Sequence, residues 1–261
     1  MVVQKSMIDR LTPSKEITLT TCNDCGLEFF DPLVPGDRAF YEWLAAAGYQ
    51  EATRWEFDEV ANRMRRGEDV IDIGCGNGAF LARVSGIAGR RVGVDLAVER
   101  NVAGPYVEIF EGTPDAYVES VDGVFDVVTA FHILEHVVDA REICVPARRL
   151  LKPGGTFFIS VPDAERPVIS KLEPLDLPPH HVSRWRTPQL ERLGGRFGLV
   201  LERVDHVPSR VYPRWLDGVP RPIALTVAAA YHSIKGAQVR FRKLFSDESG
   251  DALLAQYERP K

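Results

Sequence analysis

Three glycines at alternate positions, Gly74, Gly76 and Gly78, follow a short apolar run and precede a helical stretch. Glycine allows a tight turn and lets the backbone approach a ligand without interference from a Cβ atom. The helix that follows adds unpaired N–H groups and the positive end of its dipole. Asp95 closes the next apolar run, at the position where a carboxylate accepts both hydroxyl groups of a ribose. The pattern predicts a nucleotide-cofactor site.

The glycine loop alone also fits a nicotinamide-dinucleotide site, because Gly74, Gly76 and Ala79 satisfy the looser G-x-G-x-x-G/A pattern. Asp72 separates the two possibilities. It lies inside the first apolar run, just before the loop, where a carboxylate would repel a pyrophosphate but suits an ammonium group. The residues therefore favour a cofactor that carries an ammonium group over a dinucleotide.

Short apolar runs alternate with helical stretches along most of the chain. Runs of this length that end in Gly or Asp are typical of buried parallel strands, and their alternation with helices predicts a doubly wound α/β fold. Helices are expected over 51–66, over 79–84, over a stretch that ends at 150–151 and that Pro146 must kink or restart, and from Thr187 as N-cap. The first forty residues are predicted to be irregular. The runs expected as strands are 70–74, 91–96, 106–110, 125–131, 155–161, 199–204 and 252–258.

The segment VIDIGCGNG resembles the first motif of the class I S-adenosylmethionine (SAM) methyltransferases. The resemblance continues in order through VGVDLA (92–97), FDVVTAFHILEHV (125–137) and LLKPGGTFFISVP (150–162). PPHHVSRWRTPQLERLGGRFG (178–198) is similar to a block found in many small-molecule members. The resemblance covers about 51–206 and the final strand. It implies a Rossmann-like sheet of seven strands in the order 3-2-1-4-5-7-6, with strand 7 antiparallel.

The resemblance further implies that SAM lies across the carboxyl ends of the first two strands, as ligands do in open α/β sheets. Asp72 would hold the ammonium group of the cofactor. The backbone of Gly74, Cys75 and Gly76 would cradle its methionine part, and Asp95 would bind the ribose hydroxyl groups.

Other contacts to the cofactor follow from the same resemblance. Leu96 would pack against adenine, and Phe131 and His132 would line the methionine side. Many relatives carry Gly-Asp after the third strand, with the Asp reaching the adenine amine. Here Thr113 would substitute for that Asp, or Asp115 would reach back.

Histidines supply the candidate catalytic groups. A hydroxyl nucleophile benefits from a general base, and histidine suits that role because its reference pKa of about 6.5 leaves it mostly neutral in cytoplasm. His136 is the first candidate, since it follows the fourth strand near the expected methyl group, and His181 is the second. His136 could instead cap a helix and His181 could fix a loop. Glu135 is predicted to be a structural partner, His180 is a further candidate, and an amine acceptor would need no base.

The N-terminal segment carries a pair of cysteines. Cys22-x-x-Cys25 with GLEFFDP resembles the second half of a small zinc ribbon that precedes the catalytic domain in some relatives. Structural zinc needs four ligands, and no upstream pair completes the set. We expect a degenerate ribbon without metal, with a disulfide as the less favoured alternative. Residues 1–37 are predicted to be this stub, and 38–261 the methyltransferase domain.

Two segments of the predicted domain could face the acceptor. Tyr41, Tyr49 and Trp55 belong to an expected lid and first helix over 38–66, where core packing is the alternative. The insertion 221–246 joins an apolar stretch to a basic one, so it could touch a membrane surface or a lipid-linked substrate. Packing on the core or on a second subunit is preferred, and a homo-oligomer is compatible with the sequence.

The overall composition sets the class of protein. The 261 residues are 45% hydrophobic and 26% charged, which is typical of a globular chain with a core. Lys+Arg 32 against Asp+Glu 37 gives a net charge of −5, so no nucleic-acid partner is expected. We find no signal-peptide pattern and no apolar run long enough to span a membrane, and the four cysteines fit reduced thiols. These features predict a cytoplasmic protein.

The sequence therefore predicts a SAM-dependent methyltransferase that acts on an O or N atom of a small molecule. A sugar, nucleotide-sugar or lipid-linked glycan is the leading acceptor, by resemblance of the half-ribbon and the HHVSRW block. One alternative is an NAD(P)-dependent Rossmann oxidoreductase, against which Asp72 argues. The other is a catalytically silent SAM-fold partner protein. Asp95 and the intact glycine loop argue against lost cofactor binding in it, but no sequence feature excludes lost catalysis.

Overall fold

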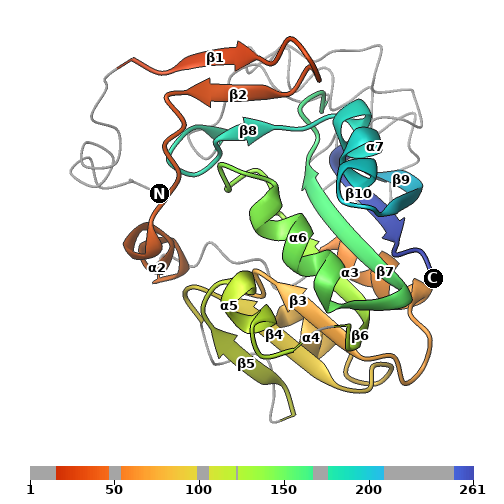
Figure 1. Ribbon diagram of the computed structural model, residues 1–261. Coiled ribbons are helices and arrows are strands. Elements are labelled where there is room, and N and C mark those ends of the chain that lie inside the picture. Colours follow the sequence, from red (N-terminus) through yellow and green to blue (C-terminus); the bar gives the residue numbers. More distant parts are fainter. Residues whose placement is uncertain (1–15, 47–53, 99–105, 122, 167–175, 209–249) are drawn as a thin grey trace, which may run out of the picture.

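The computed structural model describes residues 16–46, 54–98, 106–121, 123–166, 176–208 and 250–261. Within these residues, a seven-stranded sheet has the order β5-β4-β3-β6-β7-β10-β9 (Figure 1). β10 is antiparallel to both of its neighbours, and the other paired strands from β5 to β7 are parallel. This confirms the predicted order 3-2-1-4-5-7-6 with an antiparallel seventh strand. The strands are β3 (Val70–Ile73), β4 (Arg91–Asp95), β5 (Glu108–Glu111), β6 (Phe125–Phe131), β7 (Leu151–Pro162), β9 (Val200–Pro208) and β10 (Gly250–Glu258).

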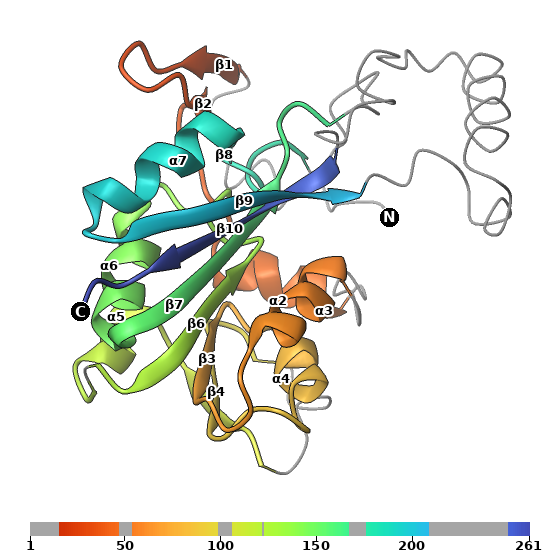
Figure 2. The same ribbon diagram turned by 90° about the vertical axis from the view of Figure 1, so that its right-hand side faces the viewer.

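Helices cover both faces of this sheet (Figure 2). α5 (Pro114–Val118), α6 (Arg141–Leu150) and α7 (Thr187–Arg196) lie on one face, and α3 (Trp55–Arg63) and α4 (Ala79–Arg83) lie on the other. Successive residues of a strand point to opposite faces, so β3 supplies Ile71 and Ile73 to one core cluster and Val70 to the other. Both faces of the central strands are therefore buried, which explains their continuous apolar runs.

Helix ends differ from the predicted ones in detail. α3 ends at Arg63, because Met64 is already extended, whereas the predicted helix continues to residue 66. The N-cap of α7 is Arg186, so Thr187 is the first helical residue and makes no capping bond. α6 runs without a break from Arg141 to Leu150 and includes Pro146, so the helix does not restart there. Proline in the sixth position loses one backbone hydrogen bond, and the packing of this buried helix face tolerates the loss.

Residues 16–40, the described part of the segment predicted to be irregular, contain regular structure, contrary to the prediction. β1 (Thr18–Thr21) and β2 (Glu28–Asp31) form an antiparallel hairpin, and β8 (Ser183–Arg184) adds a third strand beside β2. The helix α2 (Arg38–Ala46) follows. A hairpin of two short strands is marginal by itself, and the pairing with β8 supplies the support that a local pattern does not reveal. The hairpin thus connects the N-terminal segment to the segment that carries His180 and His181.

The cysteine pair lies in the turn of this hairpin. Cys22 and Cys25 are free thiols and partly exposed, and the Gln189 side chain donates a hydrogen bond of 2.8 Å to the carbonyl of Cys25. The expectation that the pair holds no metal stays a prediction. The insertion 221–246 and Tyr49 lie outside the described residues. Among the helices of the described part, none is long and apolar enough to cross a membrane.

Candidate functional site

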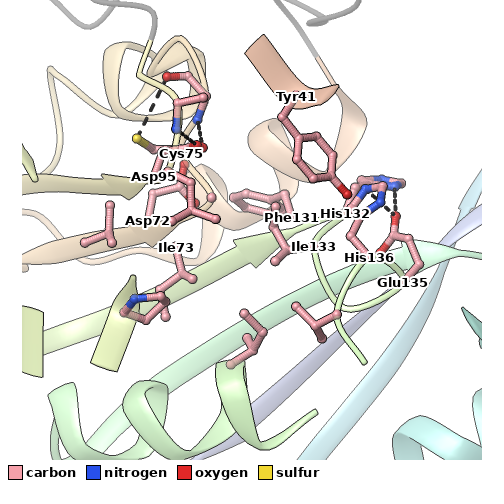
Figure 3. A pocket seen from close by; sticks show the side chains of 18 of the residues that line it. Tyr41, Asp72, Ile73, Cys75, Asp95, Phe131, His132, Ile133, Glu135 and His136 are labelled. Atoms are coloured by element: carbon pink, nitrogen blue, oxygen red, sulfur yellow. Dashed lines mark hydrogen bonds and ion pairs between the residues drawn. The ribbon is translucent and has the colours of Figure 1, made fainter. Parts of the chain in front are cut away.

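A cavity of about 530 Å³ opens at the carboxyl ends of β3, β4, β5 and β6. The glycine loop, Asp72 and Asp95 line one part of it, and Tyr41 and His136 line another, as Figure 3 shows. Strand ends in parallel sheets meet at one edge, which is why residues far apart in the sequence converge here. All the predicted cofactor residues line this cavity: Asp72, Gly74, Cys75, Gly76, Asp95, Leu96, Thr113, Phe131 and His132.

The glycine loop owes its shape to backbone conformations that favour glycine. Gly74, Gly76 and Gly78 have φ angles of 75°, 53° and 77°, in the left-handed region. Gly78 is also the N-cap of α4. The N–H of Gly74 donates to the carbonyl of Val94 over 2.7 Å, which ties the loop to the end of the neighbouring strand.

Replacing Gly74 with alanine is expected to destabilise the fold. A Cβ at this position would lie 2.2 Å from Cδ1 of Ile133, and φ would have to stay at +75°. Steric clash and backbone strain together should lower the free energy of unfolding by about 2–6 kcal/mol. Gly67→Ala is the control for strain alone, because Gly67 has φ +88° but its Cβ would meet nothing within 4 Å. Urea denaturation should show that the free energy of unfolding of this control variant falls by about 1–2 kcal/mol. Equal losses in the two variants would refute the role of the Ile133 contact.

Asp72 and Asp95 bring two carboxylates to the cofactor part of the cavity. One oxygen of Asp72 accepts a hydrogen bond of 2.7 Å from the hydroxyl of Thr129. Burial, with a smaller effect of the nearby Asp95 charge, raises the pKa of Asp72 to about 7 despite the hydrogen bond from Thr129, which lowers the pKa. No Lys, Arg or His of the described residues forms an ion pair with either carboxylate. A ligand with an ammonium group would therefore satisfy a buried acid that the described residues leave without a counter-charge.

Asp95 is held in place by backbone amides. Its two carboxylate oxygens accept hydrogen bonds from the N–H of Gly76 at 2.8 Å and of Ala97 at 2.9 Å. Burial raises the pKa of Asp95, and these amides act in the opposite direction. The side chain of the next residue, Leu96, is 44% exposed and lines the cavity wall. A carboxylate beside an exposed apolar side chain fits the ribose and adenine of a nucleoside.

The remaining predicted cofactor residues have structural roles as well. Thr113 is the N-cap of α5, where its hydroxyl accepts a hydrogen bond from the N–H of Ala116. Phe131 packs edge-to-face on Phe57 and Phe80. Cys75 is buried, and burial raises the pKa of its thiol, so it is no nucleophile at neutral pH.

Three histidines gather at the other part of the cavity. The ring centroid of His136 lies 4.5 Å from that of His180 and 4.9 Å from that of His181. Tyr41 of α2 meets the His136 ring edge-on at 5.7 Å. All four side chains line the cavity. The two predicted base candidates, His136 and His181, are thus brought together although they are 45 residues apart in the sequence.

Hydrogen bonding fixes the ring of His136. Its Nδ1 lies 2.5 Å from the carbonyl oxygen of His180. A carbonyl only accepts, so Nδ1 carries the proton and Nε2 of the neutral ring holds the free lone pair. Nε2 lies 3.9 Å from Oε1 of the buried Glu135. Burial is the largest of the effects that lower the pKa of His181 to about 2, so this ring is neutral.

The histidine cluster also has the donor types of a metal site. Nitrogen atoms of His136, His180 and His181 all lie within 4.8 Å of one another. Nitrogen ligands of zinc stand about 2.0–2.1 Å from the ion, so two of them are at most about 4.2 Å apart. The rings would have to close up to share an ion, and Nδ1 of His136 is already engaged. We assign no metal to them.

The sequence analysis did not identify Glu56 as a residue near the cavity, and it left open whether Tyr41 faces the acceptor or packs in the core. Glu56 is buried in α3 and contacts His132 through Nε2 at 2.7 Å. One sequence feature could have identified Glu56. It is an acidic residue one turn before Val60, on the apolar face of an amphipathic helix. Of the predicted lid aromatics, Tyr41 lines the cavity, whereas Trp55 packs against the core cluster under α3. The core interpretation therefore holds for Trp55.

Known proteins resemble this chain in sequence. A family model described as "Methyltransferase domain" matches residues 38–204. The ubiquinone biosynthesis O-methyltransferase of Thiobacillus denitrificans is 32% identical over 103 residues, which cover 36% of this chain and 44% of the relative. The enzyme of the same name from Pseudomonas aeruginosa is 34% identical over 105 residues, with the same coverage. The chain thus matches less than half the length of these relatives.

Solved structures share the fold. The 1,6-didemethyltoxoflavin-N1-methyltransferase of Burkholderia thailandensis, solved with 1,6-didemethyltoxoflavin and S-adenosylhomocysteine, has a TM-score of 0.56 and 16% identity, covering 94% of this chain and 100% of that one. A SAM-dependent methyltransferase from Archaeoglobus fulgidus has a TM-score of 0.53 and 14% identity, covering 85% and 95%. At these identities the likeness shows the fold alone. Together with the sheet order, it confirms the predicted class I methyltransferase fold.

Proposed function

We propose, from the premise that this chain belongs to the methyltransferase-domain family and uses S-adenosyl-L-methionine, that it methylates a hydroxyl oxygen of a small molecule. Membership of the family argues against the nicotinamide oxidoreductase alternative. The residues of the cavity fit the cofactor: Asp72 suits the ammonium group, the glycine loop the methionine backbone, and Asp95 and Leu96 the nucleoside. The cofactor supplies an activated methyl group, and the protein supplies alignment and a proton acceptor.

The fixed tautomer of His136 is the observation that carries the proposal. Its Nδ1–H donates to the His180 carbonyl, so the lone pair of Nε2 is free to take the proton of a hydroxyl nucleophile. The imidazolium that forms would lie 3.9 Å from the Glu135 carboxylate, which stabilises the positive charge. In the balanced step, the acceptor oxygen attacks the methyl carbon, the carbon–sulfur bond breaks, and the hydroxyl proton moves to His136.

His181 has a different role in this proposal. A ring whose pKa is about 2 is a weak base, so His181 would orient the acceptor by hydrogen bonding while it stays neutral. His181 and His136 thus act as a positioning group and a base. An amine acceptor needs no such base, which is why the histidines favour oxygen over nitrogen.

The acceptor is proposed to be a ring-shaped molecule with a hydroxyl group. Tyr41 and Leu44 of α2 and the His180 ring offer an apolar wall to such a ring. Two relatives of this chain are named ubiquinone biosynthesis O-methyltransferases, and these names support oxygen as the methylated atom. Sugar, nucleotide-sugar and lipid-linked glycan acceptors remain the candidates indicated by the HHVSRW block.

Transfer of a labelled methyl group tests the proposal. The protein would be incubated with SAM labelled in the methyl group and with matched sets of phenols, nucleotide sugars and amines. We expect label on oxygen in at least one hydroxyl set, with loss of one proton per methyl group. Label on amines alone would refute the proposed oxygen chemistry. Binding of S-adenosylhomocysteine without turnover on any set would favour the silent partner protein.

A further inference from the structure

His132 lies between two buried carboxylates, one from α3 and one from its own loop after β6. Its Nε2 lies 2.7 Å from Oε1 of Glu56 in α3, and its Nδ1 lies 3.4 Å from Oε1 of Glu135 in its own loop. The carboxyl side chains of Glu56 and Glu135 are 4% and 1% exposed. Both ring nitrogens thus face an acid, which favours a ring that carries both protons.

The backbone of His132 is held in an uncommon conformation. Its φ of 53° is the only positive value at a non-glycine position among the described residues. The N–H of His132 donates to the carbonyl of Ser160 over 3.0 Å, and this bond fixes the start of the loop after β6. Left-handed backbone at a side chain of this size is retained where surrounding contacts enforce it, often at functional sites.

Glu135 connects His132 to the acceptor histidines. Oε1 of Glu135 lies 3.9 Å from Nε2 of His136 and 4.0 Å from Nε2 of His181. Neither of its oxygens accepts a well-formed hydrogen bond from the described residues. A buried carboxylate in this position is costly unless a positive charge lies close to it. The nearest candidate for that charge is His132.

We propose that Glu56 and His132 are positioning residues, and that they hold Glu135 as an ionised carboxylate beneath His136. This rests on the proposed function, in which His136 is the base. Glu56 itself does not line the cavity, so it acts only through His132. The pair connects α3, which covers one face of the sheet, to the loop that presents the base.

The charged groups near His132 and Glu135 favour a protonated His132 ring and an ionised Glu135. Burial and the Arg54 charge lower the pKa of His132, but the hydrogen bond of its ring with Glu56 and its close contact with the Glu135 carboxylate raise the pKa more. Burial raises the pKa of Glu135, and the contact with the His132 ring is the largest of the effects that lower it, to about 2. Thus the groups that face His132 are Arg54 and Glu56 from the start of α3 and Glu135 from its own loop.

The test replaces Glu56 with glutamine, which keeps the size of the side chain and removes its charge. Glu59→Gln is the matched control, because Glu59 lies on the same helix and forms an ion pair of 2.5 Å with Arg63. We expect kcat for methyl transfer to fall about 10- to 100-fold in Glu56→Gln, as misplaced catalytic groups cause, and to stay unchanged in the control. The dissociation constant of S-adenosylhomocysteine should be unchanged in both variants.

A spectroscopic readout separates this role from a merely structural one. Nitrogen-15 spectra of labelled histidine should show His132 as imidazolium at pH about 7.5, above its ordinary pKa of about 6.5, and as a neutral ring in Glu56→Gln. His132→Asn identifies the signal, and asparagine tolerates left-handed backbone. Because Glu56 acts through His132, Glu56→Gln should cause no further loss in the His132→Asn background.

The outcomes discriminate between the two proposals. A neutral His132 ring in the wild-type protein, or additive losses in the double variant, would overturn the positioning pair. An imidazolium signal that depends on Glu56, found together with no methyl transfer to any acceptor, would keep the pair and reject the proposed function. Thermal unfolding of each variant shows whether it is folded.

Discussion

Replacing His136 with glutamine is expected to lower kcat for methyl transfer to a hydroxyl acceptor by roughly 100- to 10,000-fold, the range that a positioned general base supplies. Glutamine can still hydrogen-bond to the His180 carbonyl, but it cannot take up a proton. The cofactor contacts are on other residues, so the dissociation constant of S-adenosylhomocysteine should stay at the wild-type value. Single-turnover rates and calorimetric titration measure the two quantities.

His206→Gln is the control for this substitution. His206 lies on β9 outside the cavity lining, where its Nε2 is 3.4 Å from the Thr187 hydroxyl. The control variant should keep wild-type kcat. If His136→Gln also kept it, proton removal by His136 could not be part of the reaction, and an amine acceptor would become the better explanation.

Asp72 is expected to make cofactor binding depend on pH. With a pKa of about 7, Asp72 of the free protein is protonated at pH 6, whereas the ammonium group of the ligand requires the carboxylate. Binding below pH 7 must therefore release this proton. The affinity for S-adenosylhomocysteine should rise by up to about tenfold per pH unit as the pH increases toward 7 and level off above it.

The pH dependence of folding stability has the opposite sign to that of cofactor affinity. The folded protein binds the Asp72 proton more tightly than the unfolded chain does, since the pKa is about 7 against an ordinary 3.8. The stability of the free protein should thus decrease as the pH rises between these two values. Bound ligand with its ammonium group should offset that loss.

Asp72→Asn is the variant that tests this linkage. It should remove the pH dependence of binding and weaken binding roughly 10- to 100-fold, the value of a hydrogen bond to a charged group. Asp58→Asn is the control, because Asp58 is exposed on α3 and pairs with Arg83. Calorimetric titration between pH 5.5 and 8, in buffers of different ionisation enthalpy, counts the released protons. A pH-independent affinity in the wild-type protein would contradict the proposed place of the ammonium group.

Local patterns predicted the central part of the fold well. The run at 125–131 became β6 without change, and Gly74, Gly76 and Gly78 adopt the positive φ values that their spacing suggested. Strand order came from resemblance to a known family, because periodicity alone does not say which strands are neighbours. Each of these features depends on residues that are close in sequence or on a motif shared by many chains.

Contacts between distant residues could not be predicted in this way. β2 pairs with β8, far along the chain, so the N-terminal hairpin was missed. Glu56 and His132 are 76 residues apart, and the contact of Nδ1 of His136 with the His180 carbonyl spans 44. That last contact decides which nitrogen of His136 is free, and no sequence pattern contains it. The residue types of the site were thus predictable, whereas their hydrogen bonds were not.

Thermal unfolding with S-adenosylhomocysteine, for the wild-type protein and for Asp95→Ala, tests the central claim that this cavity binds SAM through Asp95. At about 100 times its dissociation constant, the ligand should add roughly 2.7 kcal/mol to the free energy of unfolding of the wild-type protein. Asp95→Ala should lose that gain, since the carboxylate that binds the ribose is gone, and NAD and NADP should stabilise neither protein. Stabilisation by NAD or NADP, or an undiminished effect of S-adenosylhomocysteine on Asp95→Ala, would contradict the account.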